Sequence, residues 1–365
     1  MLQIREITTE EQFHQIRRHW NKVLNKSSED NVFLTWEKMA PSVNHLGEVT
    51  SLKILYATDN NKIVAIAPLR KTRRTVKGKI GYNIIEPLTF GNADYTGLIL
   101  AEQEKGCLSR FLFHLFAEKD WDLFYLPDLP KTSKTLELLR AFHKNLPGFA
   151  AEPGIICPYI TIPDSKEKLL QSLSPSFRKR LERRMRKLER EKGTVQIKHY
   201  QELGSLEQAI ETLFELHQKR WTKKGGLGAF EKPEIRKMLI QTAKLFAKKK
   251  WLELYFLTIN NKPIAAQLDL AYGQKLLGNW CGFDPDYSKY SVGNLLMLKI
   301  LEECAERGII EFDFMQGAES YKFFWTNKFR QSINIRFVNR KLSSIVIGLV
   351  LRAFRTLRVS RRLFV

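Results

Sequence analysis

Two matching segments that lie 200 positions apart constrain the fold of this chain more than any other feature. The first is LKILYATDNNKIVAIAPL from Leu52, and the second is LELYFLTINNKPIAAQLDL from Leu252. Each predicts a strand, an Asn-Asn turn and a second strand, because asparagine tolerates the positive φ that tight hairpins need. The unit is too long for a solenoid repeat, so the pattern indicates a duplicated domain.

The segments that follow the two hairpins also correspond. GCLSRFLFHLFAEKDWDLFYL and VGNLLMLKILEECAERGIIEFDFM each predict a helix and then an apolar strand. Strand, strand, helix and strand, occurring twice, predict α/β or α+β layers. The chain has 365 residues, enough for two cores. We expect an N-terminal unit over 1–165, a basic helical connector over 166–192, a C-terminal unit over 193–335 and a basic amphipathic tail over 336–365.

The net charge of +21 is concentrated in two segments. Segment 174–192 has nine basic and three acidic residues, and its apolar positions recur at steps of four, four and three from Phe177. This spacing predicts a helix that begins at Ser174-Pro175 and stops at Gly193. The helix is either a solvated one packed by a thin apolar stripe or an arm that binds an anion.

The second basic segment, 336–365, has eight basic residues and no acidic ones. Its apolar residues from Leu342 to Leu357 follow helical spacing. Such a helix could lie on an anionic membrane surface. The alternative is a terminal helix that docks on its own protein or on a second subunit.

The sequence predicts a cytoplasmic protein, with peripheral association at the inner face of the membrane as an option. The start, MLQIREITTEEQF, lacks an apolar signal region, and no run of 18 apolar residues exists. The four cysteines lack C-x-x-C spacing, and the histidines show no metal-ligand spacing. We therefore expect no disulfide framework and no metal.

A site for phosphate is predicted in the second half. NWCGFDPDY is followed by a buried helix that starts at Ser291 or Val292, and Gly293 would let a ligand approach the backbone. The free N–H groups of such a helix attract phosphate or pyrophosphate. The pattern is neither a Walker loop nor a G-x-G-x-x-G fingerprint, which disfavours nucleoside triphosphates and NAD.

The runs FELHQKRW, INNKPIAAQL, GFDPDYSKYSVGNLL and GIIEFDFMQGAESYKFFW together resemble the GNAT superfamily. Within it, the chain looks most like the CelD/BcsL-type acetyltransferases of cellulose and exopolysaccharide biosynthesis, which are related to Fem-type aminoacyl transferases. The resemblance is best from about Ser174 to Trp325, and looser in the first half through FLTWEKM and WDLFYLPDLP. It implies an α/β (α+β) chain with two tandem GNAT-like folds, a basic helix between them and a C-terminal amphipathic helix.

The resemblance implies acetyl-CoA or another acyl-CoA as the donor, with Ser291, Gly293 and Asn294 around its pyrophosphate. The family's loop usually reads Q/R-x-x-G-x-G/A, and here only Gly293 of its glycines is kept. Fem-like enzymes instead take the acyl group from charged tRNA. The basic helix would suit the tRNA phosphate backbone.

The same resemblance suggests catalytic residues. Lys322, in GAESYKFFW, would stabilise developing negative charge, and Tyr321 would act as the general acid for the leaving group. Asp313 would orient the acceptor amine or accept its proton. The alternatives are an exposed salt bridge for Lys322 and a paired structural carboxylate for Asp313.

Substrate-binding residues are expected on the predicted helix that carries H-x-x-R-W and on the loop before the phosphate site. His217 and Arg220 are three apart and share a helix face, with Trp221 beside them. Asp284 and Tyr287 belong to the loop. His217 could also be an ordinary core histidine, and Trp221 a packing residue.

We therefore expect an acyltransferase that moves an acyl group from acyl-CoA to an amine or hydroxyl of a sugar or cell-envelope precursor. Direct attack is favoured, since no nucleophile is evidently placed for a covalent intermediate. The alternatives are a Fem-like aminoacyl-tRNA-dependent transferase and a non-catalytic, membrane-associated scaffold. A nucleic-acid-binding module rests on charge alone, because no known recognition motif is present.

Overall fold

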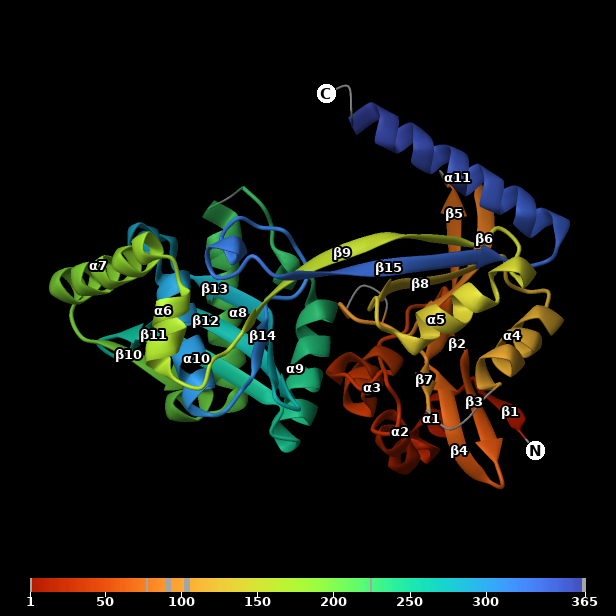
Figure 1. The fold of residues 1–365 in the computed structure, drawn as a ribbon, viewed down its shortest axis with the longest axis horizontal. Helices are drawn as coiled ribbons and strands as arrows, with labels where there is room; N and C mark the ends of the chain where they lie inside the picture. Colours follow the sequence, from red (N-terminus) through yellow and green to blue (C-terminus); the bar gives the residue numbers. More distant parts are fainter. Residues whose placement is uncertain (1, 77, 90–92, 102–105, 224, 363–365) are drawn as a thin grey trace. The chain divides into compact units, whose positions relative to one another are not determined.

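The computed structural model describes residues 2–76, 78–89, 93–101, 106–223 and 225–362, with side chains up to residue 353, apart from that of residue 203. The chain forms two compact units, drawn in Figure 1. Unit 1 comprises Met1–Ile155 and Gln331–Val365, and unit 2 comprises Ile156–Arg330. The two boundaries fall inside the strands β9 (Ala150–Thr161) and β15 (Phe329–Val338). The mixed α/β class predicted from the sequence is confirmed.

Unit 2 is a mixed sheet with helices packed on it. Its strand order is β10–β11–β12–β13–β14–β9. Neighbouring strands in this order run antiparallel, except β13 and β14, which run parallel. Its strands are β10 (Val195–His199), β11 (Leu252–Ile259), β12 (Lys262–Tyr272), β13 (Lys275–Phe283) and β14 (Glu311–Asp313). Its helices are α6 (Lys166–Ser172), α7 (Pro175–Lys192), α8 (Leu206–Lys223), α9 (Pro233–Lys248) and α10 (Val292–Glu306).

The core of unit 2 explains why its helices sit where they do. Helix α10 is apolar on most sides, as its sequence predicts, and it packs with Tyr255 and Leu257 of β11 in one cluster. Helix α7 adds three buried residues, Phe177, Leu181 and Leu188, to the same cluster. These buried residues make α7 part of the fold of unit 2. The remainder of the helix is polar, and most of its basic side chains face solvent.

The predicted ends of the basic helix are confirmed. The Ser174 hydroxyl accepts a hydrogen bond from the Phe177 N–H, Pro175 occupies the first turn, and Gly193 follows the last residue. Gly193 has φ 106°, a conformation that favours glycine.

Unit 1 contains two sheets and a helical layer. One sheet has the order β1–β3–β4–β7, and the other has the order β9–β15–β8–β6–β5–β2, with β6 and β8 parallel. Its strands are β1 (Gln3–Ile7), β2 (Thr50–Leu52), β3 (Ile54–Asp59), β4 (Lys62–Ala67), β5 (Leu69–Val76), β6 (Ile80–Pro87), β7 (Ile99–Leu100) and β8 (Leu123–Leu129). Its helices are α1 (Glu10–Gln15), α2 (Arg17–Leu24), α3 (Trp36–Val43), α4 (Cys107–Ala117), α5 (Lys134–Ala141) and α11 (Leu342–Arg362).

Both predicted hairpins are present, and they share a detail beyond the sequence match. Asn60 and Asn61 join β3 to β4 with φ 45° and 60°, and Asn260 and Asn261 join β11 to β12 with φ 48° and 65°. Each hairpin also has a register shift just before the matched threonine, between positions 57/58 and 257/258. The same irregularity at the same offset supports the duplication.

The basic tail is helical, as predicted. Helix α11 packs on the β6 side of unit 1 through Ile347, which clusters with Tyr82, Ile84 and Val338. The expected basic side chains at 355, 358, 361 and 362 lie outside the described side chains. Among the described residues, no helix is long and apolar enough to cross a membrane.

Candidate active site

The predicted phosphate site lies at the start of α10 in unit 2. After β13 the chain forms one short 3-10 helix, Pro285–Tyr290, and Ser291 then adopts the left-handed conformation (φ 58°, ψ 44°) before α10 begins at Val292. Helix geometry leaves the N–H groups of Val292 and Gly293 without an intrahelical partner. Gly293 is exposed, and a Cβ built on it would meet only Phe283, at 3.9 Å. The start of α10 is therefore open to an anion.

The loop before α10 is held by Asp284. Its Oδ1 accepts the Asp286 N–H at 3.1 Å, and its Oδ2 accepts from Lys219 Nζ of α8 at 3.0 Å. Burial alone would raise the pKa of this carboxyl, but these two hydrogen bonds hold the pKa below its usual value. Asp284 therefore fixes the loop to α8, which is a positioning contact.

The basic helix α7 reaches the same loop. The Tyr290 hydroxyl donates to Glu191 at 2.7 Å, and the Lys192 ammonium lies 6.0 Å from the centroid of the Tyr287 ring. Tyr287 is thus a partly buried member of the contact between the end of α7 and the loop before α10.

Lys322 is buried, so the alternative of an exposed salt bridge is wrong. Its side chain is 4% exposed, and Nζ donates to the carbonyl oxygens of Met315, Gln316 and Gly317 at 3.2, 2.5 and 3.4 Å. It also forms an ion pair with Glu319 at 3.0 Å. The ammonium group therefore ties together the loop that follows β14.

Asp313 is buried at the end of β14 and has partners. Its Oδ1 accepts the Met315 N–H at 2.8 Å, and its Oδ2 lies 3.4 Å from Arg330 Nη1. These contacts agree with the paired structural carboxylate considered from the sequence, and they fix the turn into the loop held by Lys322.

Tyr321 and Arg220, which lie 101 positions apart, come together. Arg220 Nη1 donates to Cys281 Sγ of β13 at 3.0 Å, and the guanidinium stacks on Phe283. Burial raises the pKa of the Tyr321 phenol, the nearby Cys281 and Glu319 raise it further, and Arg220 opposes them. Tyr321 therefore stays protonated at neutral pH and can donate a proton or a hydrogen bond.

His217 lies one turn before Arg220 on α8, in an aromatic setting. Trp221 Nε1 donates to His217 Nε2 at 3.0 Å, and Phe230 and Trp280 pack on the imidazole. Burial, with a smaller contribution from Arg220, lowers the pKa of His217 to about 4. The neutral ring then carries its proton on Nδ1, which has no hydrogen-bond partner in the part of the chain that the structure describes.

Two residues near this site were missed by the sequence reasoning. They are Cys281, which the sequence marks only as one of four cysteines without C-x-x-C spacing, and Asp269 of β12, for which the sequence analysis predicts no role. Asp269 is fully buried; its Oδ1 accepts from Gln267 at 2.9 Å, and its Oδ2 has no partner among the described residues. Burial raises the pKa of this carboxyl well above its usual range. An acid inside the apolar run AAQLDLAY was the available signal.

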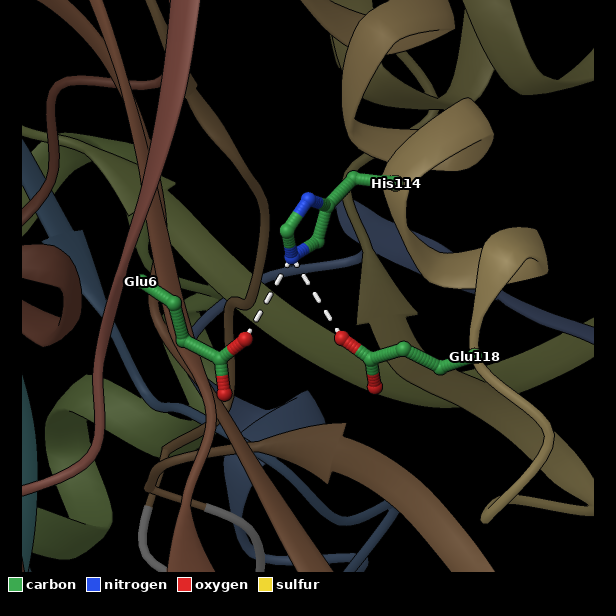
Figure 2. Close-up of side chains that lie close together, drawn as sticks. All are labelled: Glu6, His114 and Glu118. Carbon is green, nitrogen blue, oxygen red and sulfur yellow. Dashed lines mark hydrogen bonds and ion pairs between the residues drawn. The ribbon is translucent and has the colours of Figure 1, made fainter.

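A separate cluster in unit 1 brings together Glu6, His114 and Glu118 (Figure 2). His114 Nε2 lies 3.3 Å from Glu6 and 3.4 Å from Glu118. The buried Lys53 ammonium lies 2.7 Å from Glu6 and 2.5 Å from Glu118, so one cation of the protein itself is shared by the two carboxylates. This arrangement is a charged network that joins β1, the residue between β2 and β3, and the C-terminal end of α4.

Comparison with known proteins finds one family match within unit 2. Residues 175–323 match the model of the acetyltransferase (GNAT) domain, a span that includes α7, the start of α10 and the loop up to Lys322. Within unit 2, this span is therefore similar to a GNAT acetyltransferase domain. No curated protein matches the chain in sequence.

Three solved structures share the fold over nearly the whole chain. FemX aligns with a TM-score of 0.64 and 9% identity, covering 95% of this chain and 100% of that one. L-PGS from Bacillus licheniformis aligns with a TM-score of 0.55 and 12% identity, covering 94% and 98%. A C-terminal domain assigned to a lysylphosphatidylglycerol synthetase from Agrobacterium fabrum aligns with a TM-score of 0.51 and 10% identity, covering 93% and 96%.

Proposed function

We propose that unit 2 transfers an acyl group from acyl-CoA to an amine or hydroxyl of a sugar or cell-envelope precursor, such as one used for exopolysaccharide. The observation that carries this proposal is the open start of α10. Ser291, Gly293 and Asn294 follow a strand and a tight loop there, within the span of the acetyltransferase domain match. The positive end of α10 would hold the pyrophosphate of the donor.

The proposed chemistry is direct transfer. Tyr321, kept protonated by burial, would donate its proton to the thiolate leaving group, and the Arg220 guanidinium would stabilise the oxyanion as the acceptor attacks. The proton that the acceptor loses would restore the Tyr321 phenol. Lys322 would contribute by fixing the loop that carries Tyr321, with its positive charge close to that loop. The unused Nδ1–H of His217 and the buried carboxyl of Asp269 are candidate contacts for the acceptor.

The substitution Gly293→Asp tests the donor site. The aspartate would stabilise the start of α10 through the helix dipole, but its charge would repel a pyrophosphate. We expect acyl-CoA affinity, measured by calorimetry, to fall roughly tenfold or more while the melting temperature stays at or above that of the wild type. Gly47→Asp, at an open position in unit 1, is the charge-matched control. Unchanged acyl-CoA affinity in Gly293→Asp would rule out this donor site.

A second candidate is a Fem-like transferase that takes its acyl group from aminoacyl-tRNA. The favouring observation is the placement of α7. Near its start, Phe177 packs on Phe324 and Trp325 just after Tyr321 and Lys322, and at its end Glu191 meets the loop before α10. The exposed basic face of α7 therefore runs from one part of the proposed site to the other, as the backbone of a tRNA acceptor stem would require.

The two donors can be told apart by binding. The acyl-CoA proposal expects calorimetric binding of acetyl-CoA that Arg183→Glu/Arg186→Glu on the exposed face of α7 leaves largely intact. The tRNA proposal expects no acyl-CoA binding and a salt-dependent tRNA affinity that the same double variant weakens. A chain that binds neither donor would favour the non-catalytic scaffold.

A further inference from the structure

The outward side of α11 carries an apolar stripe that is exposed among the residues of unit 1 that the structure describes. Leu342, Ile345, Val346 and Leu349 are 78%, 39%, 51% and 61% exposed, and they recur at the i, i+3, i+4 and i+7 positions of one helix face. The opposite side of the helix is already docked, with Ile347 8% exposed and Ser344 fully buried. Helix α11 therefore has two apolar sides: one packs on unit 1, and the other is exposed.

The inward side of α11 is fixed firmly enough to present this stripe. The Ser344 hydroxyl donates to Asp122 at 2.8 Å, and Lys341 pairs with the same carboxylate at 3.1 Å. Gly348 lies so close to β15 that an added Cβ would come within 2.8 Å of Val338. The exposed face is therefore held on a packed helix.

An apolar cavity continues the stripe inward. It has a volume of about 310 Å³ and lies between α11 and the sheet. Ile345 and Leu349 of the stripe line it together with Leu123, Pro147, Val338 and Leu351. Arg336 and Arg352 complete the lining, and the other residues are apolar or glycine, so the cavity extends the apolar surface that a partner could cover.

The charge of the helix indicates which partner. From Leu342 to the end of the chain there are five arginines and no acidic residue. Arg352 is exposed three positions after Leu349, where the stripe continues on the helix. A neutral or apolar surface does not attract an excess of positive charge. An anionic lipid surface attracts basic residues and accepts apolar side chains at the same depth.

We propose that α11 docks unit 1 on a bilayer that contains anionic phospholipid. The helix lies in the plane of the interface, with Leu342, Val346 and Leu349 in the boundary between headgroups and acyl chains, and the net positive charge of the tail attracts it to the lipid phosphate groups. This docking is independent of the acyl donor, since every residue that carries it belongs to unit 1.

Co-sedimentation of the full chain with vesicles tests the proposal. We expect binding to vesicles of phosphatidylcholine with phosphatidylglycerol, weaker binding to phosphatidylcholine alone, and a loss of affinity as salt is raised. Val346→Asp/Leu349→Asp should weaken binding on the order of tenfold or more, because it removes two apolar side chains from the interface.

The matched control is Val49→Asp/Phe113→Asp, which adds the same charge at two exposed apolar positions of unit 1 that do not belong to α11, 62% and 79% exposed. It should bind vesicles like the wild type, and both variants should keep the wild-type melting temperature. The proposal is overturned if the wild type stays in the supernatant with both lipid mixtures, or if the α11 variant binds as well as its control. A dimer that only the α11 variant dissociates would assign the stripe to a second copy of the chain instead.

Discussion

At the scale of single residues, the neutral side chain of His217 in α8 should make the free energy of unfolding depend on pH. Burial lowers the pKa of His217 to about 4, against 6.5 for the free side chain. Between pH 4 and 6.5 the histidine is protonated in the unfolded chain and neutral in the folded chain. The free energy of unfolding is therefore highest above pH 6.5 and decreases as the pH falls towards 4. The difference corresponds to about 3 kcal/mol over that window.

His217→Gln should therefore flatten the pH dependence of the free energy of unfolding between pH 6.5 and 4, whatever it does to stability at neutral pH. The measurement is urea denaturation at several pH values. His143→Gln, at an exposed histidine, serves as the control. An unchanged slope in the His217 variant would mean that the imidazole becomes protonated in the folded protein.

At the scale of elements, the approach of α8 to β13 depends on one glycine. A Cβ added to Gly282 would lie 2.3 Å from the backbone nitrogen of His217 and 2.6 Å from the carbonyl carbon of Leu216. Both contacts are to backbone, so neither can move away without shifting the helix.

We expect Gly282→Ala to destabilise the protein by about 1–3 kcal/mol or more, as overpacking does, and to reduce activity because α8 carries Arg220. Thermal melting and turnover would measure the two effects. Gly293→Ala is the comparison for stability, since its site is open and α10 should tolerate or gain from alanine. Equal melting temperatures for the two variants would contradict the close packing.

Many of the helices, caps and turns could be predicted from the sequence. The hairpins, the capped basic helix and the start of α10 rest on local rules of turns, caps and periodicity, and all three were correct. The contacts of Lys322 with loop carbonyls, of Arg220 with Cys281 and of His114 with Glu6 could not be predicted in this way. The Lys322 contacts are local, but they depend on the irregular path of the loop after β14, which no periodicity or capping rule predicts. The other two contacts join positions that only the tertiary fold brings together, and a single sequence contains no signal for them.

At the scale of the whole molecule, unit 1 is built from two separate parts of the chain. Ile333, Ile335 and Phe337 of β15 are buried in the same cluster as Leu126 and Phe124 of β8. We expect a chain that stops at residue 330 to lose the fold of unit 1, and a chain that stops at 340 to keep it with a lower melting temperature, since only α11 is removed. Circular dichroism and limited proteolysis would distinguish the two. A well-folded 1–330 chain would show that β15 is dispensable.

The late position of β15 also bears on synthesis at the ribosome. Every residue of unit 2 emerges before the strand that completes unit 1, so the usual order, in which the N-terminal part folds first, is inverted. Until residues 331–338 are made, β8 is an unpaired edge on the side that β15 will occupy, and the apolar side chains that β15 covers remain accessible. The nascent chain therefore holds an open sheet edge for most of its synthesis, which is the interval in which a chaperone would be needed.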